Sequence, residues 1–188
     1  MTEIRQQAEK IKRLIEDLNL TSKLEYDMQP LRISNIYPVE LARQVICEFL
    51  DSNLDKKYVF EFESEPQCET EFIRGDEVLI KRAITNLIQN SINHNANGCK
   101  ITISVTCSEK EIAIVVSDNG VGVSAEKLKA LNSKTHYLES TDRTLHLRHG
   151  LGVLLVRQIV EAHNGIMQIL SEEQKGYETT LIFPKTKY

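Results

Sequence analysis

The spacing of apolar residues along the chain predicts most of its helices. Within residues 1–28, apolar side chains recur at alternating intervals of four and three, the spacing of a heptad seam: Ile4, Ala8, Ile11, Ile15 and Leu18. Polar and charged residues fill the other faces, and Pro30 ends the helix. This helix either packs on its own domain or is a fragment of a dimerising helical hairpin. The narrow seam favours the second interpretation.

Four further helices are predicted over residues 38–50, 77–94, 124–131 and 150–163. Pro38 suits the first turn of its helix, because an N–H group would be unpaired at that position anyway. Asp76 and Ser124 carry side-chain oxygens that can cap the helices following them. The pair Asn164-Gly165 supplies a turn that ends the last helix.

Strands are predicted where apolar and polar residues alternate, over residues 58–62, 71–74, 101–105, 112–117, 166–171 and 179–183. The run from Ile112 to Ser117 is more continuously apolar, which indicates a central strand. Residues 132–149 lack periodicity and are predicted to form a mobile loop. Together these elements predict an α+β fold, an α/β sandwich with a mixed sheet and helices on one of its faces.

Composition excludes several classes of protein. The chain has 188 residues, of which 41% are hydrophobic and 27% charged, as in ordinary globular domains. A net charge of -4 gives no electrostatic reason to expect nucleic-acid binding. No apolar run is long enough to span a membrane, and the N-terminus is too charged for a signal peptide. We therefore expect a cytoplasmic chain without membrane contact, whether or not a parent protein is membrane-anchored.

The four cysteines carry no metal or redox motif. None of Cys47, Cys68, Cys99 and Cys107 forms a CxxC pair with another. We expect all four to be reduced thiols that pack as small hydrophobic side chains.

Three segments carry candidate chemistry. Asn86 and Asn90 lie four residues apart on the helix over 77–94, so both project from one face, either as a solvated polar stripe or toward a phosphate–magnesium cluster. Asp118 begins the loop Asp-Asn-Gly-Val-Gly, which forms either a plain turn or an acceptor for the amino group of a base. Gly150 and Gly152 open the next helix, where backbone N–H groups and the helix dipole can bind phosphate.

Taken together and in this order, these segments resemble the nucleotide-binding motifs of the histidine-kinase catalytic domain. Its superfamily also holds type II topoisomerases, the ninety-kilodalton chaperone and mismatch-repair ATPases. NLIQNSINH is similar to the family's N-box, DNGVG to its first glycine box and GLGVLLVRQIVEAHNG to its second. YETTLIFPK resembles the last strand, and LTSKLEYDMQPLRIS the end of the second dimerisation helix with its connector.

The resemblance implies a Bergerat-type ATP-binding fold with a mostly antiparallel sheet. It assigns residues 1–30 to the dimerisation helix and connector, and residues 31–188 to the ATP-binding domain. Asn90 would bind Mg2+ and Asp118 would read adenine. The implied contacts to ATP come from Asn86, Asn90, His94, Asp118, Gly120, Gly122, Gly150, Leu151, Gly152 and Thr179.

The residue type at the motif position of Asn86 distinguishes the branches of this superfamily. Members that hydrolyse ATP efficiently carry a glutamate there, as general base for an attacking water, and asparagine cannot take a proton at neutral pH. The chain therefore resembles the kinases, in which a histidine on the dimerisation hairpin attacks ATP. No His-Glu/Asp-x-x-x-Pro segment is present in the sequence, so we expect the acceptor histidine to lie outside this chain.

Two motif positions depart from the family. The residues after Asn90 that are usually basic and aromatic are Asn93 and His94, and His94 suits either a phosphate contact or a helix end. The loop between the glycine boxes lacks the usual phenylalanine pair, and offers Arg143 or Arg148 as a lid contact to phosphate.

The implied partners are the protein's own dimerisation and phosphoacceptor domain and a response regulator. A seam as short as that of residues 1–28 predicts only a weak homodimer. Two alternatives remain open: a degenerate partner-binding module without activity, and a serine kinase of the anti-sigma type, which usually keeps the glutamate that Asn86 replaces.

Overall fold

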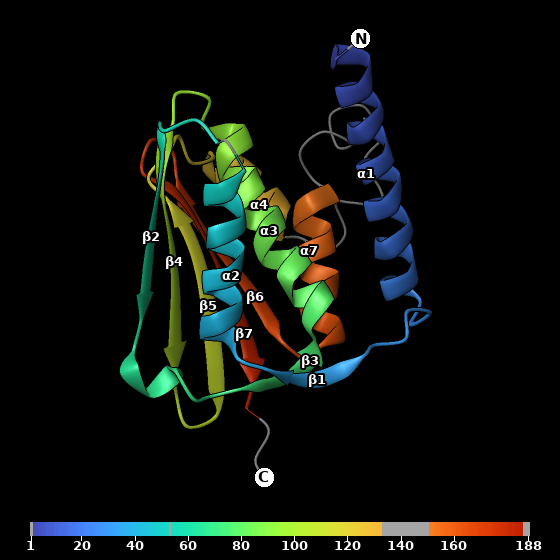
Figure 1. Ribbon diagram of the computed structural model, residues 1–188, viewed down its shortest axis with the longest axis vertical. Coiled ribbons are helices and arrows are strands. Elements are labelled where there is room, and N and C mark those ends of the chain that lie inside the picture. The colour runs from blue at the N-terminus through green and yellow to red at the C-terminus, as the bar shows by residue number, and fades with distance from the viewer. Residues whose placement is uncertain (1, 53, 133–150, 186–188) are drawn as a thin grey trace.

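Helices cover one face of a five-stranded sheet, and a long N-terminal helix runs beside them (Figure 1). The computed structural model describes residues 2–52, 54–132 and 151–185. Its sheet has the order β2 (Tyr58–Ser64), β4 (Cys99–Cys107), β5 (Glu111–Asp118), β7 (Gly176–Pro184) and β6 (Ile166–Glu172). The β2–β4 pair is parallel and the other three pairs are antiparallel. The predicted α+β sandwich with a mixed, mostly antiparallel sheet is confirmed.

The core lies between this sheet and three helices, α2 (Pro38–Asp51), α3 (Glu77–His94) and α7 (Leu151–Ala162). Alternate residues of β4 and β5 turn toward the helices and are fully buried, as expected for strands with one covered face: Ile101, Ile103, Val105, Ile112 and Ile114. The short helix α4 (Ala125–Asn132) lies near β6. β5 is central in the sheet, as its continuous apolar run predicted.

Helix α3 has the predicted bounds, because its start is fixed by a local cap. The Asp76 carboxylate accepts a hydrogen bond from the Leu79 amide at 3.2 Å, and its other oxygen accepts from the Arg32 amide at 2.9 Å. The amide of Asp76 donates to Nε2 of His163 at 2.9 Å, while Nδ1 of His163 donates to the Ile159 carbonyl at 2.6 Å. This buried histidine therefore joins the end of α7 to the start of α3.

Three details differ from the sequence prediction. The strand β1 (Ile33–Ile36) was not predicted; it pairs antiparallel with β3 (Ile73–Asp76). Three of its four residues are exposed, so it lacks the alternation that reveals a strand. β3 begins and ends two residues later than expected, and β7 begins three residues earlier, at Gly176. The predicted loop over 132–149 falls almost entirely outside the described residues.

The expectation of four reduced cysteines is wrong for two of them. Cys68, in the short 3-10 helix η1 (Pro66–Cys68), forms a disulfide with Cys107 at the end of β4, with 5.8 Å between their Cα atoms. The partners are 39 residues apart in sequence, so no local spacing pattern reveals the pair. Cys47 and Cys99 are free.

Helix α1 (Thr2–Glu25) presents two different faces. One face packs along α7: Thr21 and Leu24 are buried there, and Asp17 forms an ion pair with Arg82 of α3 at 2.6 Å. The seam residues Ile11, Ile15 and Leu18 remain 56%, 54% and 52% exposed. The helix therefore packs on its own domain and still exposes its seam, and the dimerising interpretation stays a prediction.

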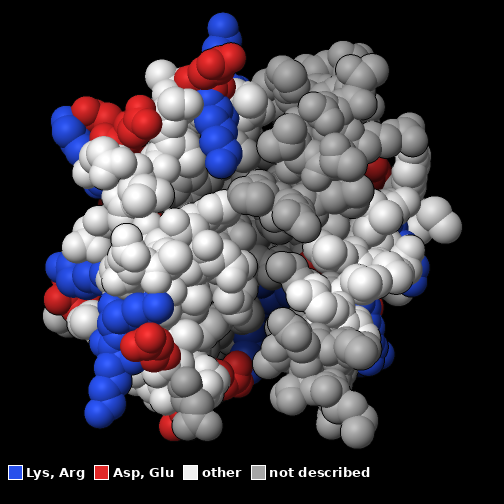
Figure 2. Space-filling view, turned by 90° about the horizontal axis from the view of Figure 1, so that it is seen from above, with Lys and Arg blue, Asp and Glu red and all other residues white. Residues whose placement is uncertain are grey.

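The described surface carries charged side chains of both signs. Acidic and basic side chains are interspersed over the described residues of the face that Figure 2 shows. None of the described helices is long and apolar enough to cross a membrane.

Candidate functional site

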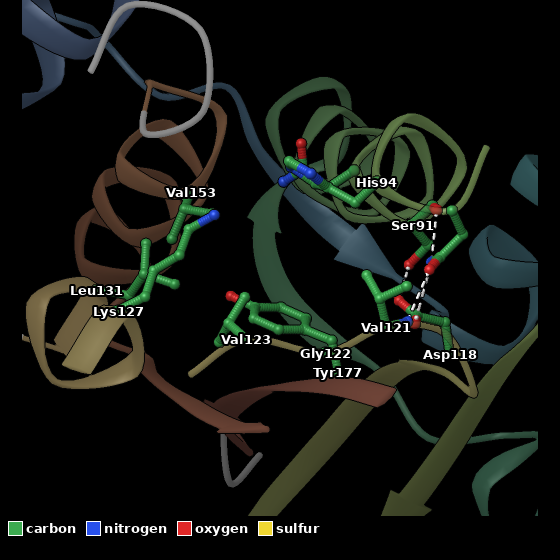
Figure 3. Close-up of a pocket in the computed structure, with 12 residues that line it drawn as sticks. Ser91, His94, Asp118, Val121, Gly122, Val123, Lys127, Leu131, Val153 and Tyr177 are labelled. Atoms are coloured by element: carbon green, nitrogen blue, oxygen red, sulfur yellow. Dashed lines mark hydrogen bonds between the residues drawn. The ribbon is translucent and has the colours of Figure 1, made fainter. Parts of the chain in front are cut away.

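A cavity of about 150 Å³ opens between the end of α3, the loop after β5, and the helices α4 and α7 (Figure 3). Its polar lining comes mainly from α3 and from the end of β5. Its apolar lining comes from the loop after β5 and from both helices: Val121, Val123, Leu131 and Val153. Tyr177 of β7 adds an aromatic ring.

Four of the predicted site residues meet in this cavity, although they come from separate segments. Asn90 and His94 reach it from α3, and Asp118 and Gly122 from the loop after β5. His94 is exposed at the cavity edge, while only 9% of Asp118 is exposed. The fold therefore brings residues of both motif segments onto one cavity, and their roles there stay predictions.

Asp118 is held by three hydrogen bonds. Its Oδ2 accepts from the Ser91 hydroxyl at 2.6 Å, and its Oδ1 accepts from the Asn95 amide group at 3.2 Å and from the Gly120 N–H at 2.9 Å. The side chain is thus a fixed, buried acceptor.

Sequence reasoning missed Ser91 and Asn95. Both are 5% exposed, and both lie on the stripe of α3 that continues from the buried Leu87 at intervals of four. A stripe that changes from apolar to polar at a helix end was the available signal, because buried polar groups need partners. The remaining missed residues line the cavity through tertiary packing alone: Val121, Val123, Lys127, Leu131, Val153 and Tyr177.

Two glycines shape the loop after β5. A Cβ atom on Gly120 would lie 1.8 Å from the side-chain oxygen of Asn95, so no side chain fits there. Gly122 has a φ of +60°, and a Cβ on it would lie 2.2 Å from the Glu172 carbonyl oxygen. The glycines therefore let this loop pack tightly between α3 and the β6–β7 hairpin.

The second glycine box lies beside the N-box. A Cβ on Gly152, in the first turn of α7, would be 3.5 Å from the side-chain oxygen of Asn90. Leu151 is the first residue of α7 and is half-buried, but neither it nor Gly152 lines the cavity. Gly150 lies outside the described residues, as do Arg143 and Arg148.

Two other predicted residues lie near the cavity without lining it. The Asn86 amide nitrogen is buried and finds no hydrogen-bond partner among the described residues, and the same is true of the Thr179 hydroxyl. Thr179 pairs with Val116 on β5, two residues before Asp118, and points toward the same face of the sheet. An orphaned buried polar group is costly, so each is suited to a partner that enters the site.

The charges around the cavity are few. Lys127 of α4 contributes a basic group, which the sequence analysis did not single out. Burial, and secondarily the nearby Asp118 charge, raises the pKa of the Cys99 thiol, so this buried cysteine stays protonated at neutral pH.

The described residues include no cluster of three or more His, Cys, Asp or Glu side chains that could hold a metal ion. A magnesium ion bound here would therefore take oxygens from its ligand. The Asn90 side-chain oxygen in the cavity fits this arrangement, because Mg2+ usually takes one or two protein oxygens together with phosphates and water.

A helix-covered mixed sheet with a buried carboxylate facing an asparagine-bearing helix defines a nucleotide-binding domain of the superfamily named above. A model of the family "Histidine kinase-, DNA gyrase B-, and HSP90-like ATPase" matches residues 75–187. The chain belongs to this family.

The chain is similar to parts of known sensor kinases. It is 29% identical over 182 residues to the sensor histidine kinase YvrG of Bacillus subtilis, covering 97% of this chain and 31% of YvrG. The histidine kinase AdeS of Acinetobacter baumannii shares the fold with a TM-score of 0.77, at 20% identity over 99% of this chain and 84% of that one. Full-length ShkA in complex with AMPPNP gives 0.78, at 16% identity over 99% of this chain and 38% of ShkA. The chain spans about a third to a half of the length of its curated relatives.

Proposed function

We propose that this chain is the ATP-binding catalytic region of a two-component sensor histidine kinase. It holds Mg-ATP for phosphoryl transfer to a histidine outside the chain. The observation that carries the proposal is the buried Asp118 carboxylate at the end of β5, in one cavity with Asn90 of α3. This is the pairing of a base-reading group with a phosphate-side group that the family motifs require.

Asp118 would accept a hydrogen bond from the amino group of adenine. A hydrogen bond to a charged group is worth about 1.5–3 kcal/mol, roughly a tenfold to hundredfold change in affinity. The apolar lining around Asp118, with the Tyr177 ring, suits the flat faces of a base. Thr179 and Gly122 complete this end of the site.

The phosphates would lie toward Asn90 and the start of α7. There, the first-turn N–H groups and the helix dipole favour negative charge, and the absence of a side chain at Gly152 lets phosphate approach the backbone. Asn86, Gly150 and Leu151 belong to this end, and His94 and Lys127 add basic groups at the cavity. Bound magnesium supplies charge neutralisation, while the protein's own contribution is positioning.

The asparagine at position 86 supports a nucleophile that comes from outside this chain. An asparagine cannot deprotonate water, so we expect little ATP hydrolysis by this chain alone. The partners would be the protein's own dimerisation and phosphoacceptor domain and a response regulator. We expect the chain to act in the cytoplasm, where a response regulator would meet it.

The first test is calorimetric titration with AMPPNP, with and without magnesium. The wild-type chain should bind with micromolar, magnesium-dependent affinity. Asp118→Ala should raise Kd by roughly tenfold to a hundredfold. Circular dichroism should show that the variant keeps its fold. Asp55→Ala, which removes an exposed carboxylate in a turn, is the matched control and should bind as wild type.

Unchanged affinity in Asp118→Ala would reject the assignment of that residue. A folded wild-type chain that binds no nucleotide would instead favour the partner-binding module. Once binding is established, transfer of labelled phosphate to a separately supplied dimerisation domain tests the kinase activity itself.

A further inference from the structure

Asn95 connects three segments of the site. It is the C-cap residue of α3, and its amide group donates to the Ser91 carbonyl at 2.8 Å and to Asp118 Oδ1 at 3.2 Å. Its side-chain oxygen accepts from the Val121 N–H at 2.9 Å, in the loop after β5. The helix end, the carboxylate and the loop are therefore joined through one buried side chain.

The hydrogen bonds on Asp118 leave little acceptor capacity unused. A carboxylate offers about four acceptor positions. Described residues fill two on Oδ1, from Asn95 and Gly120, and one on Oδ2, from Ser91. The position left is on Oδ2, and Asp118 lines the cavity.

This arrangement has a consequence for the choice of base. An ionised carboxylate can only accept hydrogen bonds, so the remaining position on Oδ2 matches a donor such as the 6-amino group of adenine. The 6-oxo group of guanine is also an acceptor, so it cannot form a hydrogen bond with Oδ2. Both oxygens would then be desolvated without a partner. If Asn95 were absent, the carboxylate could rotate and the loop would lose its tie to α3.

We propose that Asn95 is a positioning residue which, with Ser91, orients the Asp118 carboxylate and so selects 6-amino over 6-oxo purine nucleotides. The inference rests on the proposed nucleotide site. Asn95 itself lines the same cavity, but it acts through Asp118 and the loop.

The first measurement needs no nucleotide. In Asn95→Ala, the Val121 amide loses its acceptor, and its hydrogen exchange in the ligand-free protein should become at least tenfold faster. Asn93→Ala is the matched control, because Asn93 is exposed at the same helix end and its side-chain oxygen accepts a hydrogen bond from Gln89 at 3.2 Å. That control should leave Val121 exchange unchanged.

The second measurement compares AMPPNP with its guanine counterpart by calorimetry. Wild type should favour the adenine compound by at least tenfold, and Asn95→Ala should reduce this preference by tenfold or more, mainly by weakening adenine binding. A residue with only a structural role would weaken both nucleotides equally. Ser91→Ala should act in the same direction, because Oδ2 loses its donor.

Asn95→Asp adds a pH signature. Ionising two carboxylates this close together is costly. They therefore share a proton at low pH and repel each other once that proton is lost. At about pH 5.5 the introduced carboxyl group donates to Asp118 as the amide did, and adenine affinity should approach that of wild type. At about pH 8 affinity should fall at least tenfold below wild type. The other titratable groups facing this position are Cys99, His94 and Lys127, so each value is taken relative to wild type at the same pH.

The outcomes separate the two proposals. If wild type binds adenine nucleotide and Asp118→Ala does not, yet Asn95→Ala keeps wild-type preference and Val121 exchange, then Asn95 does not position the carboxylate. A pH-independent Asn95→Asp variant would overturn the inference in the same way. If folded wild type binds no nucleotide, the proposed function and the base selection both fail.

Discussion

At the scale of single residues, the site depends on how closely α3 approaches the loop after β5. Asn95 fills the space where a Gly120 side chain would stand, and the same contact brings the Val121 amide within hydrogen-bond reach. Gly152 differs, because a Cβ there would make only an ordinary contact with Asn90. Packing therefore requires a glycine at position 120, whereas it does not require one at position 152, where the predicted reason is ligand approach.

Replacing Gly120 by alanine should therefore be costly. The Cβ would force Asn95 or the loop to move, and overpacking of this kind costs about 1–3 kcal/mol in the free energy of unfolding. Urea denaturation measures this loss, with Gly152→Ala as the comparison. Gly152→Ala should not destabilise, and a gain of up to about 1 kcal/mol is expected from helix propensity. Equal losses in both variants would contradict the packing argument.

At the scale of elements, two cross-links hold peripheral segments to the sandwich. The Cys68–Cys107 disulfide ties η1 to the end of β4, and the Asp17–Arg82 ion pair ties α1 to α3. Neither follows from local sequence, because each joins residues at least 39 positions apart. Both can be removed without touching the cavity.

Reducing the disulfide should lower stability measurably. For a closed loop of 39 residues, chain entropy gives about 4 kcal/mol as an upper estimate of the loss in the free energy of unfolding. Urea denaturation of the wild type, with and without a thiol reductant, should show this shift. Cys107→Ser should reproduce it and no longer respond to reductant.

Cys47→Ser, which removes an exposed free thiol, is the control and should behave as wild type. A transition insensitive to reductant would mean that the bridge is absent in solution.

Breaking the ion pair should loosen α1 without unfolding the domain. Arg82→Ala leaves the Asp17 carboxylate, 18% exposed, without its partner, at a cost of about 1 kcal/mol for a partly buried pair. Amide exchange in the C-terminal half of α1 should accelerate, and more so at low salt, where the pair is strongest. Lys81→Ala, which removes an exposed pair with Glu48, should leave α1 exchange unchanged.

At the scale of the whole molecule, the exposed seam of α1 sets the expected oligomeric state. Ile11, Ile15 and Leu18 form an exposed apolar stripe on α1. Such stripes favour association, but this one is short, so only a weak dimer is expected.

Sedimentation at several concentrations tests this expectation. The wild type should show concentration-dependent association, and Ile15→Asp should make it monomeric at every concentration, because a charge on the seam must be desolvated in the dimer. Val78→Asp is the control, since Val78 is also an exposed apolar side chain but lies on α3. A dimer that survives Ile15→Asp would place the interface elsewhere.

The sequence by itself determined what depends on local spacing. It located α3 between Asp76 and His94, because a cap and a periodic apolar face are both encoded within consecutive residues. It identified β5 as central from its continuous apolar run, and it predicted that Asn90 and Asp118 belong to one site. The roles of all the predicted site residues, Asn90 and Asp118 included, stay predictions.

Only the tertiary structure decided what depends on distance through space. Several contacts join segments that are far apart in the chain. They are the Cys68 disulfide, the pairing of β1 with β3, the packing of α1 on the sandwich, and the hydrogen bonds of Asn95 to Asp118 and Val121. Hydrogen bonds and close packing act over a few ångströms, and no periodicity along the sequence records which distant residues come that near.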